Sequence, residues 1–234
     1  VGRDVVYQYG AGTSEIGEEL LRLENLSYKK EVKGINLTLH RGEVLGLAGL
    51  EGAGRTELLE LIYGVKRPES GKMFLEGQEV VIRSPGDAKA HGIAYLTKDR
   101  KSQGLFLRKS VCENVLAANM DRFSKKGIVQ PQGARQDAED YKEKFEIKTP
   151  DVDKLVSQLS GGNQQKVLLS MWISRNPQLL LIDEPTRGID VGTKETIHRL
   201  IRQFAKEGMG VIIVSSDMPE LMGASDRIVA MYEG

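Results

Sequence analysis

The sequence predicts an α/β protein in which helices cover a mostly parallel sheet. Three observations lead to this class. Short apolar runs typical of buried strands alternate with segments of helical period, a glycine-rich stretch joins one such strand to a helix, and a second apolar strand ends in two acids. The 234 residues are enough for one α/β domain that carries an inserted subdomain.

The elements follow one another in a regular order. In the first half, the apolar pattern predicts strands over 20–28, 34–40, 43–50 and 92–96, the last of them central in the sheet, and a helix over 56–63. A charged connector over 98–109, for which a solvated loop is the simplest interpretation, leads into a helical region over 111–146 with a polar break near 125–133. In the last part we expect strands over 178–183, 210–216 and 227–232, and an amphipathic helix over 193–206.

Composition excludes several classes of protein. Lys plus Arg and Asp plus Glu both total 33, so the neutral chain offers no overall charge for nucleic acid or an anionic membrane. Its longest apolar run, 228–232, is far shorter than the roughly 18 residues of a membrane-spanning helix. The one cysteine, Cys112, cannot form an internal disulfide, which fits a reducing compartment.

The stretch 49–56, GLEGAGRT, follows a predicted strand and opens a predicted helix. Glycines suit this place because main-chain N–H groups can then wrap a phosphate, and the start of the helix adds a positive dipole end. The Thr56 hydroxyl is placed to hold Mg²⁺, and Arg55 stands where the usual pattern has lysine. The alternative is a glycine-rich turn without a ligand. The residues expected to bind the phosphates are Gly49, Gly52, Ala53, Gly54, Arg55 and Thr56.

Two carboxylates end the apolar strand 178–183. Asp183 lies where open α/β sheets bind ligands and can hold Mg²⁺, directly or through water. Glu184 points the other way in extended backbone and can orient an attacking water as a general base. The alternative is an ordinary strand end with two acidic residues. The phosphate loop in the same chain favours the ligand-binding interpretation.

The segment 159–166, LSGGNQQK, precedes a helix that runs to about residue 174. Ser160 can cap this helix, and Gly161 and Gly162 leave its first N–H groups open to an anion. A capped surface helix is the alternative. Two phosphate-binding edges on one chain need an explanation.

Together and in this order, the phosphate loop, LSGGNQQ and LLLIDEP resemble the ATPase domain of ATP-binding cassette proteins over residues 20–234. More narrowly, GLEGAGRT, the stretch from Asp99, LSGGNQQK and DEPTRGIDVG resemble the second ATPase domain of the tandem ATPase subunit of bacterial monosaccharide importers of the ribose, galactose, xylose and arabinose type. The opening Val1–Asp4 is similar to the end of the first domain. In that family the signature of one domain closes over nucleotide held by its partner, which accounts for the two edges.

The resemblance implies a P-loop NTPase fold of the ATP-binding cassette type, with a mostly parallel central sheet, an antiparallel β region and an inserted helical subdomain. We expect a linker or arm over 1–18, an ATP-binding core over 19–97 and 171–234, and the helical subdomain with the signature over 98–170. ATP and Mg²⁺ are the implied cofactors. The implied partners are a preceding ATPase domain, transmembrane permease subunits and, indirectly, a sugar-binding protein, with no nucleic acid; the place is the cytoplasmic side of the inner membrane, peripherally.

Three positions depart from the family pattern. Lys98 stands where the resemblance implies Gln or Glu near Mg²⁺ and water, and a cation cannot coordinate a metal. Ser216, at the end of the predicted strand 210–216, stands where the resemblance implies a histidine, and Arg55 stands where it implies lysine. All three fall around one γ-phosphate, so we expect this domain's own loop to bind nucleotide but to hydrolyse it weakly, while Ser160, Gly161 and Gly162 complete the partner's site. Tyr28 is the candidate to stack on adenine, or an ordinary strand residue.

The resemblance implies that the region around residues 99–120 docks a membrane subunit. Its apolar residues Leu105, Phe106 and Leu107 fit a contact with a partner helix, with a small local core as the alternative. Two other functions remain open. One is a soluble ATP-binding cassette ATPase of DNA repair or translation, which calls for basic surface or long coiled-coil insertions that the sequence lacks. The other is a non-hydrolysing, nucleotide-binding regulatory half.

Overall fold

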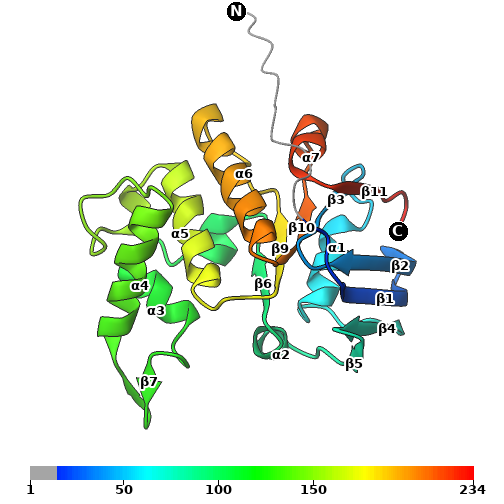
Figure 1. The fold of residues 1–234 in the computed structure, drawn as a ribbon, viewed down its shortest axis with the longest axis horizontal. Helices are drawn as coiled ribbons and strands as arrows, with labels where there is room; N and C mark the ends of the chain where they lie inside the picture. The colour runs from blue at the N-terminus through cyan, green and yellow to red at the C-terminus, as the bar shows by residue number, and fades with distance from the viewer. Residues whose placement is uncertain (1–14) are drawn as a thin grey trace, which may run out of the picture. The chain divides into compact units, whose positions relative to one another are not determined.

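The computed structural model describes residues 15–234 (Figure 1). Most of the arm expected over 1–18 lies outside the described residues. Two compact units make up the chain: the first holds residues up to Tyr95, Gln178–Pro185 and His198–Gly234, and the second holds Leu96–Pro177 and Thr186–Ile197. The subdomain boundaries that we placed at 98 and 170 stay a prediction.

A five-stranded sheet forms the centre of the first unit. Strand β10 pairs in parallel with β3 and β9, and β3 pairs in parallel with β11. Every residue of β3, β9 and β10 is buried, as expected for parallel strands covered on both faces. The order across the sheet is β11 (Arg227–Ala230), β3 (Val44–Ala48), β10 (Gly210–Val214), β9 (Leu179–Asp183) and β6 (Ile93–Leu96).

The prediction that strand 92–96 is central in the sheet was wrong. β6 lies at the edge, beside β9 alone, although all four of its residues are buried. An apolar run reports that a strand is covered, not how many strands flank it, so the sequence pattern could not give its position.

A second, antiparallel sheet belongs to the same unit, as the resemblance implied. Its order is β2 (Val32–His40), β1 (Glu19–Tyr28), β4 (Ser70–Leu75) and β5 (Gln78–Val80). The helices of this unit are α1 (Arg55–Ile62), α2 (Pro85–Ala90), α7 (Met218–Ala224) and the part of α6 (Val191–Lys206) from His198 onward. The apolar face predicted for α6 is buried, with Ile197 and Phe204 fully so.

The second unit is mainly helical. Helices α3, α4 and α5 pack on one another, as Figure 1 shows. The polar break predicted near 125–133 holds a small hairpin, and the charged connector contains a π-helical turn. The elements are η1 (Arg100–Gly104), α3 (Val111–Ala118), β7 (Ser124–Lys125), β8 (Ile128–Val129), α4 (Pro131–Lys144), η2 (Val156–Gln158) and α5 (Gly161–Ile173). Within residues 15–234 no helix combines the length and the apolar character that a membrane span requires.

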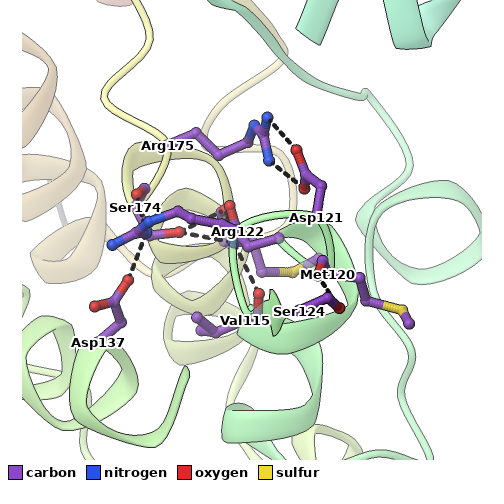
Figure 2. Close-up of polar contacts among 10 residues, drawn as sticks. Val115, Met120, Asp121, Arg122, Ser124, Asp137, Ser174 and Arg175 are labelled. Atoms are coloured by element: carbon purple, nitrogen blue, oxygen red, sulfur yellow. Dashed lines mark hydrogen bonds and ion pairs between the residues drawn. The ribbon is translucent and has the colours of Figure 1, made fainter. Parts of the chain in front are cut away.

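Buried polar contacts anchor the C-terminal end of α5 to the end of α3 (Figure 2). The Asn119 amide is fully buried and donates to the carbonyl of Met171 at 3.0 Å and to Ser174 Oγ at 2.8 Å. Beside it, Arg175 makes a two-pronged contact with Asp121 at 2.8 and 2.9 Å. Since bidentate guanidinium–carboxylate pairs fix direction as well as distance, the helix that begins at Gly161 is held firmly at its other end.

Candidate functional site

The parallel register brings three loops to one edge of the central sheet. Val214 at the end of β10 pairs with Leu47 of β3 on one side and Asp183 of β9 on the other. The glycine-rich stretch 49–56 follows β3, Glu184 follows β9 and the turn 215–217 follows β10. The phosphate loop, the acidic strand end and the predicted γ-phosphate position therefore meet in the first unit.

The loop 49–56 has the conformation that its glycines predict. Gly54 takes φ +92° at the start of α1, and a Cβ there would lie 1.9 Å from the carbonyl oxygen of Glu31. Gly52 takes φ +84°, and a Cβ there would meet no atom within 4 Å. The first turn of α1 has no side-chain cap, so its N–H groups face the loop without a protein acceptor from the cap residue. A strand, a glycine loop and an open helix start form the cradle that a phosphate needs.

Thr56 and Asp183 meet across this loop. The Thr56 hydroxyl donates to Asp183 Oδ2 at 2.8 Å, although 127 positions separate the two residues. A hydroxyl and a carboxylate are hard oxygen ligands, the donor set that Mg²⁺ takes when phosphate oxygens and water complete its shell. The residues present therefore fit Mg²⁺ with a nucleotide. Within 15–234 no cluster of three or more His, Cys, Asp or Glu side chains forms a metal site made of protein groups alone.

Tyr95 is a neighbour of this pair that the sequence did not indicate. Burial, followed by the nearby Asp183 carboxylate, raises the pKa of Tyr95 far above its ordinary value. The phenol therefore stays protonated beside Asp183. Nothing in the run GIAYL distinguishes this tyrosine from a core residue before the fold is known.

Arg55 does not extend over the loop. Its side chain is only 8% exposed, and Nη1 donates to the carbonyl of Ser215 at 2.8 Å. The cation that would contact phosphate in the usual pattern is engaged with the end of β10 instead.

Glu184 and Ser216 are in direct contact. The Ser216 hydroxyl donates to Glu184 Oε2 at 3.1 Å. Glu184 has φ +51°, an uncommon conformation for a residue with a side chain, and its N–H donates to the carbonyl of Val214 at 2.8 Å. Backbone strain of this kind is often found at functional sites. Ser216 thus orients the carboxylate that we expect to act on water.

Tyr28 ends β1, beside the turn whose Glu31 carbonyl touches Gly54. Its ring is faced by the amines of Lys29 and Lys66, with Nζ at 4.9 and 5.5 Å from the ring centroid. The hydrogen bond with Tyr28 is the main cause that raises the pKa of Lys29. The role of Tyr28 toward adenine stays a prediction.

Lys98 and the signature residues belong to the second unit. Lys98 is half-buried in the bend after β6. Ser160 caps α5, where its hydroxyl accepts from the Asn163 N–H at 3.4 Å, as predicted. The capping serine is exposed, while Gly162 behind it is buried.

Neighbouring side chains lie close to both signature glycines. A Cβ on Gly162 would lie 2.4 Å from Thr193 Cγ2, and one on Gly161 would lie 2.8 Å from Arg100 Nη2. Arg100 also donates to the carbonyl of Arg187 at 2.8 Å, so η1 and the turn after Pro185 both reach the start of α5. Sequence reasoning missed Arg100, which lay in what we expected to be a solvated connector.

The apolar part of that connector divides in two. Leu105 is buried, while Phe106 is 58% exposed. A local core and an exposed aromatic side chain are thus present together.

The sequence of this chain is similar to those of known transporter proteins. The model of the ABC transporter family matches residues 32–187. The chain is 44% identical over 234 residues to a putative ribose/galactose/methyl galactoside import ATP-binding protein of Halalkalibacterium halodurans and 43% identical over 235 residues to the ribose import ATP-binding protein RbsA of Clostridium tetani. Each alignment covers 100% of this chain but only 45% and 46% of the relative, so the chain spans about half the length of these curated relatives.

Solved structures agree on the fold. A nucleotide-free ATP-binding cassette from an ABC transporter superposes with a TM-score of 0.81 at 20% identity, over 93% of this chain and 89% of that one. A dimeric ATP-binding cassette bound to ADP and phosphate gives 0.77 at 23% identity, over 92% and 95%. The predicted ATP-binding cassette fold is confirmed, and the chain belongs to the ABC transporter family.

Proposed function

We propose that this chain is the nucleotide-binding part of a sugar importer, coupling ATP binding and hydrolysis to uptake across the cytoplasmic membrane. The observation that carries the proposal is the Thr56–Asp183 contact at the phosphate loop, at 2.8 Å. The names of the relatives, ribose or ribose/galactose/methyl galactoside import ATP-binding proteins, support the substrate class.

The proposal includes the partners of the chain. A preceding ATPase domain of the same subunit fits relatives twice as long as this chain. Transmembrane permease subunits and a sugar-binding protein would complete the importer, with this domain peripheral on the cytoplasmic side. Phe106, exposed beside the buried Leu105, is the candidate contact for a permease. The choice of sugar would rest with the other subunits.

We further propose that the chain's own loop binds ATP and Mg²⁺ but hydrolyses ATP weakly. Arg55 is engaged with Ser215, and Ser216 cannot carry the positive charge that a histidine could bring. The Lys98 side chain is a third departure. Removing one charge-stabilising donor from such a site costs roughly 10²-fold in rate, so three departures can leave little turnover. Ser160, Gly161 and Gly162 would complete the partner domain's site.

Binding and hydrolysis can be tested on the same protein. We expect MgATP to bind to the wild type, and Asp183→Asn and Thr56→Val to remove the Mg²⁺-dependent part of the affinity while leaving that measured in EDTA. Calorimetry with and without Mg²⁺ gives both values. Turnover should be slow, and Glu184→Gln should abolish what there is. Failure to bind ATP would refute the assignment, and rapid turnover abolished by Glu184→Gln would refute the weak site alone.

One alternative keeps support from the structure. The contact of Arg55 with Ser215 also suits a nucleotide-binding regulatory half that never hydrolyses. Substitutions at Gly161 in the signature segment distinguish the importer role from the regulatory role, because only the importer role makes sugar uptake depend on this residue. A soluble ATPase acting on nucleic acid has no such observation in its favour.

A further inference from the structure

The turn 215–217 is held at Ser215, a residue for which no role was predicted. Ser215 is 2% exposed, and both its carbonyl and its hydroxyl are hydrogen-bonded. Its carbonyl accepts from Arg55, its hydroxyl donates to Glu220 Oε2, and the same hydroxyl accepts from the Asp217 N–H at 3.0 Å. One buried serine therefore joins the phosphate loop to α7.

A second buried contact stands behind Glu220. Its Oε1 lies 2.7 Å from Nε2 of His198 on α6, and the side chains of Glu220 and His198 are 5% and 1% exposed. Burying a carboxylate and an imidazole costs free energy that apolar side chains would not, so such a pair is a poor way to stabilise a helix contact. The other oxygen of the Glu220 carboxylate accepts from the Ser215 hydroxyl, so the pair is linked to the turn 215–217.

On its other side the turn reaches the proposed base. Ser216 follows Ser215 directly, and its hydroxyl donates to Glu184 at 3.1 Å. The same part of the chain also fixes the main chain of Glu184, whose N–H donates to the Val214 carbonyl. A displacement of Ser215 would therefore move both supports of Glu184.

We propose that His198 and Glu220 are positioning residues for Glu184. They fix the Ser215 hydroxyl, and through it they hold the turn that keeps Ser216 against Glu184. This inference rests on the proposed function, in which Glu184 faces the nucleotide. It gives the buried pair a role in hydrolysis without any contact with nucleotide.

The test compares four variants of the protein that carries this chain. Ser215→Ala cuts the network at its centre with the loss of one oxygen, Glu220→Leu removes the carboxylate, and Glu220→Gln conserves its shape and one hydrogen bond. Arg202→Met is the matched control, because Arg202 lies on the same helix and makes a buried pair with Asp226 at 2.9 Å that does not involve the turn.

Three measurements are made on each variant. Single-turnover hydrolysis, with protein in excess over labelled ATP, detects even slow chemistry, and calorimetry gives the affinity for MgATP. Hydrogen exchange at the Ser216 and Asp217 amides reports the turn without any need for activity. For Ser215→Ala and Glu220→Leu we expect hydrolysis to slow about tenfold or more, affinity to stay within about twofold, and exchange at the two amides to rise about tenfold. Glu220→Gln should retain most of the rate, and Arg202→Met should match the wild type in all three measurements.

Equal losses in Arg202→Met and Ser215→Ala would overturn the proposal, since they would show a general effect of helix packing. Unchanged exchange in Ser215→Ala would overturn it too. If the wild type bound no ATP, the proposed function would fall on its own, and the positioning role toward hydrolysis would fall with it even if exchange identified Ser215 as the anchor of the turn. If ATP bound but only the network variants left hydrolysis unchanged, this inference alone would fail.

Discussion

Arg55 of the phosphate loop donates from Nη1 to the main-chain carbonyl of Ser215 at 2.8 Å, so the loop's own cation is directed at the end of a neighbouring strand. Lysine has a shorter reach and a compact charge, whereas the guanidinium is a planar fork suited to a fixed carbonyl. Arginine in place of the usual lysine at position 55 therefore changes both the shape of the cation and the place where its positive charge lies.

Arg55→Lys should therefore strengthen the site. The amine can approach the phosphates as a point charge, and we expect single-turnover hydrolysis to rise about tenfold or more. The lost bond to Ser215 should cost about 1 kcal/mol of stability, measured by urea unfolding. Arg55→Met is the control, since it loses the same bond without bringing a charge. Equal hydrolysis by the two variants would show that the cation at position 55 does not limit the reaction.

Helix anchoring in the second unit gives a prediction for stability. Asn119 is fully buried, and its amide donates to the carbonyls of Val115 and Met171 and to Ser174 Oγ within 3.0 Å. Asn119→Leu leaves these groups short of a donor, and we expect the free energy of unfolding to fall by about 2 kcal/mol. Arg135→Ala breaks a pair with Asp153 that is exposed to solvent, and it should lower the free energy of unfolding far less than Asn119→Leu does. Urea titration compares them, and similar losses would contradict this account.

Strands β3, β6, β9 and β10 of the central sheet could be predicted because they are buried, mainly apolar runs, and the pairing of Thr56 with Asp183 followed from the chemistry of the two motifs. Strand β4 was missed because its first three residues are exposed, and because the apolar Phe74 between the buried Met73 and Leu75 hides the alternation. Helix α2 was missed for its length and its glycine, Gly86.

Contacts between polar residues that are distant in the chain could not be predicted from the sequence. His198, Glu220 and Ser215 come from α6, α7 and the end of β10, and none of them was predicted to be a site residue. Their contact depends on how two helices pack on the sheet, which hydrophobic period specifies only as a face. Arg100 was missed because a charged run is equally typical of a solvated loop.

The start of α3 gives a prediction on pH. Glu113 Oε2 accepts from the Ser110 N–H at 2.8 Å, and Ser110 Oγ accepts from the Glu113 N–H at 3.1 Å, which is a capping box. The bond from the Ser110 N–H holds the pKa of Glu113 below its ordinary value. Because the folded pKa is depressed, the stabilisation is fully present above about pH 4.3 and is lost as the pH falls through the folded value.

Glu113→Gln should remove that pH-dependent part. The urea midpoint of the variant should lie below that of the wild type at pH 7, and the difference should disappear at acidic pH, where the wild-type carboxyl is protonated as well. A difference that stays constant with pH would show that the charge of Glu113 adds nothing to the cap.

Gly161 provides the prediction that separates a trans role from a local one. A Cβ at this position would lie 2.8 Å from Arg100 Nη2 and 3.2 Å from the Gly188 carbonyl. The guanidinium is the end of a flexible side chain, so Gly161→Ala should be accommodated with a partial loss of function. Gly161→Asp adds a negative charge at a helix start that we propose closes on the partner's nucleotide, where an anion of the protein would compete with phosphate.

We expect Gly161→Asp to lower ATP-dependent sugar uptake by the whole importer about tenfold or more, and Gly161→Ala to lower it far less. The affinity of the chain's own loop for MgATP should be the same in both variants, because Thr56 and Asp183 are untouched. Uptake into membrane vesicles, normalised to the amount of assembled importer, measures the first quantity and calorimetry the second. Normal uptake with Gly161→Asp would rule out the trans role. Reduced affinity at the chain's own loop would mean that the substitution acts through the fold of this chain instead.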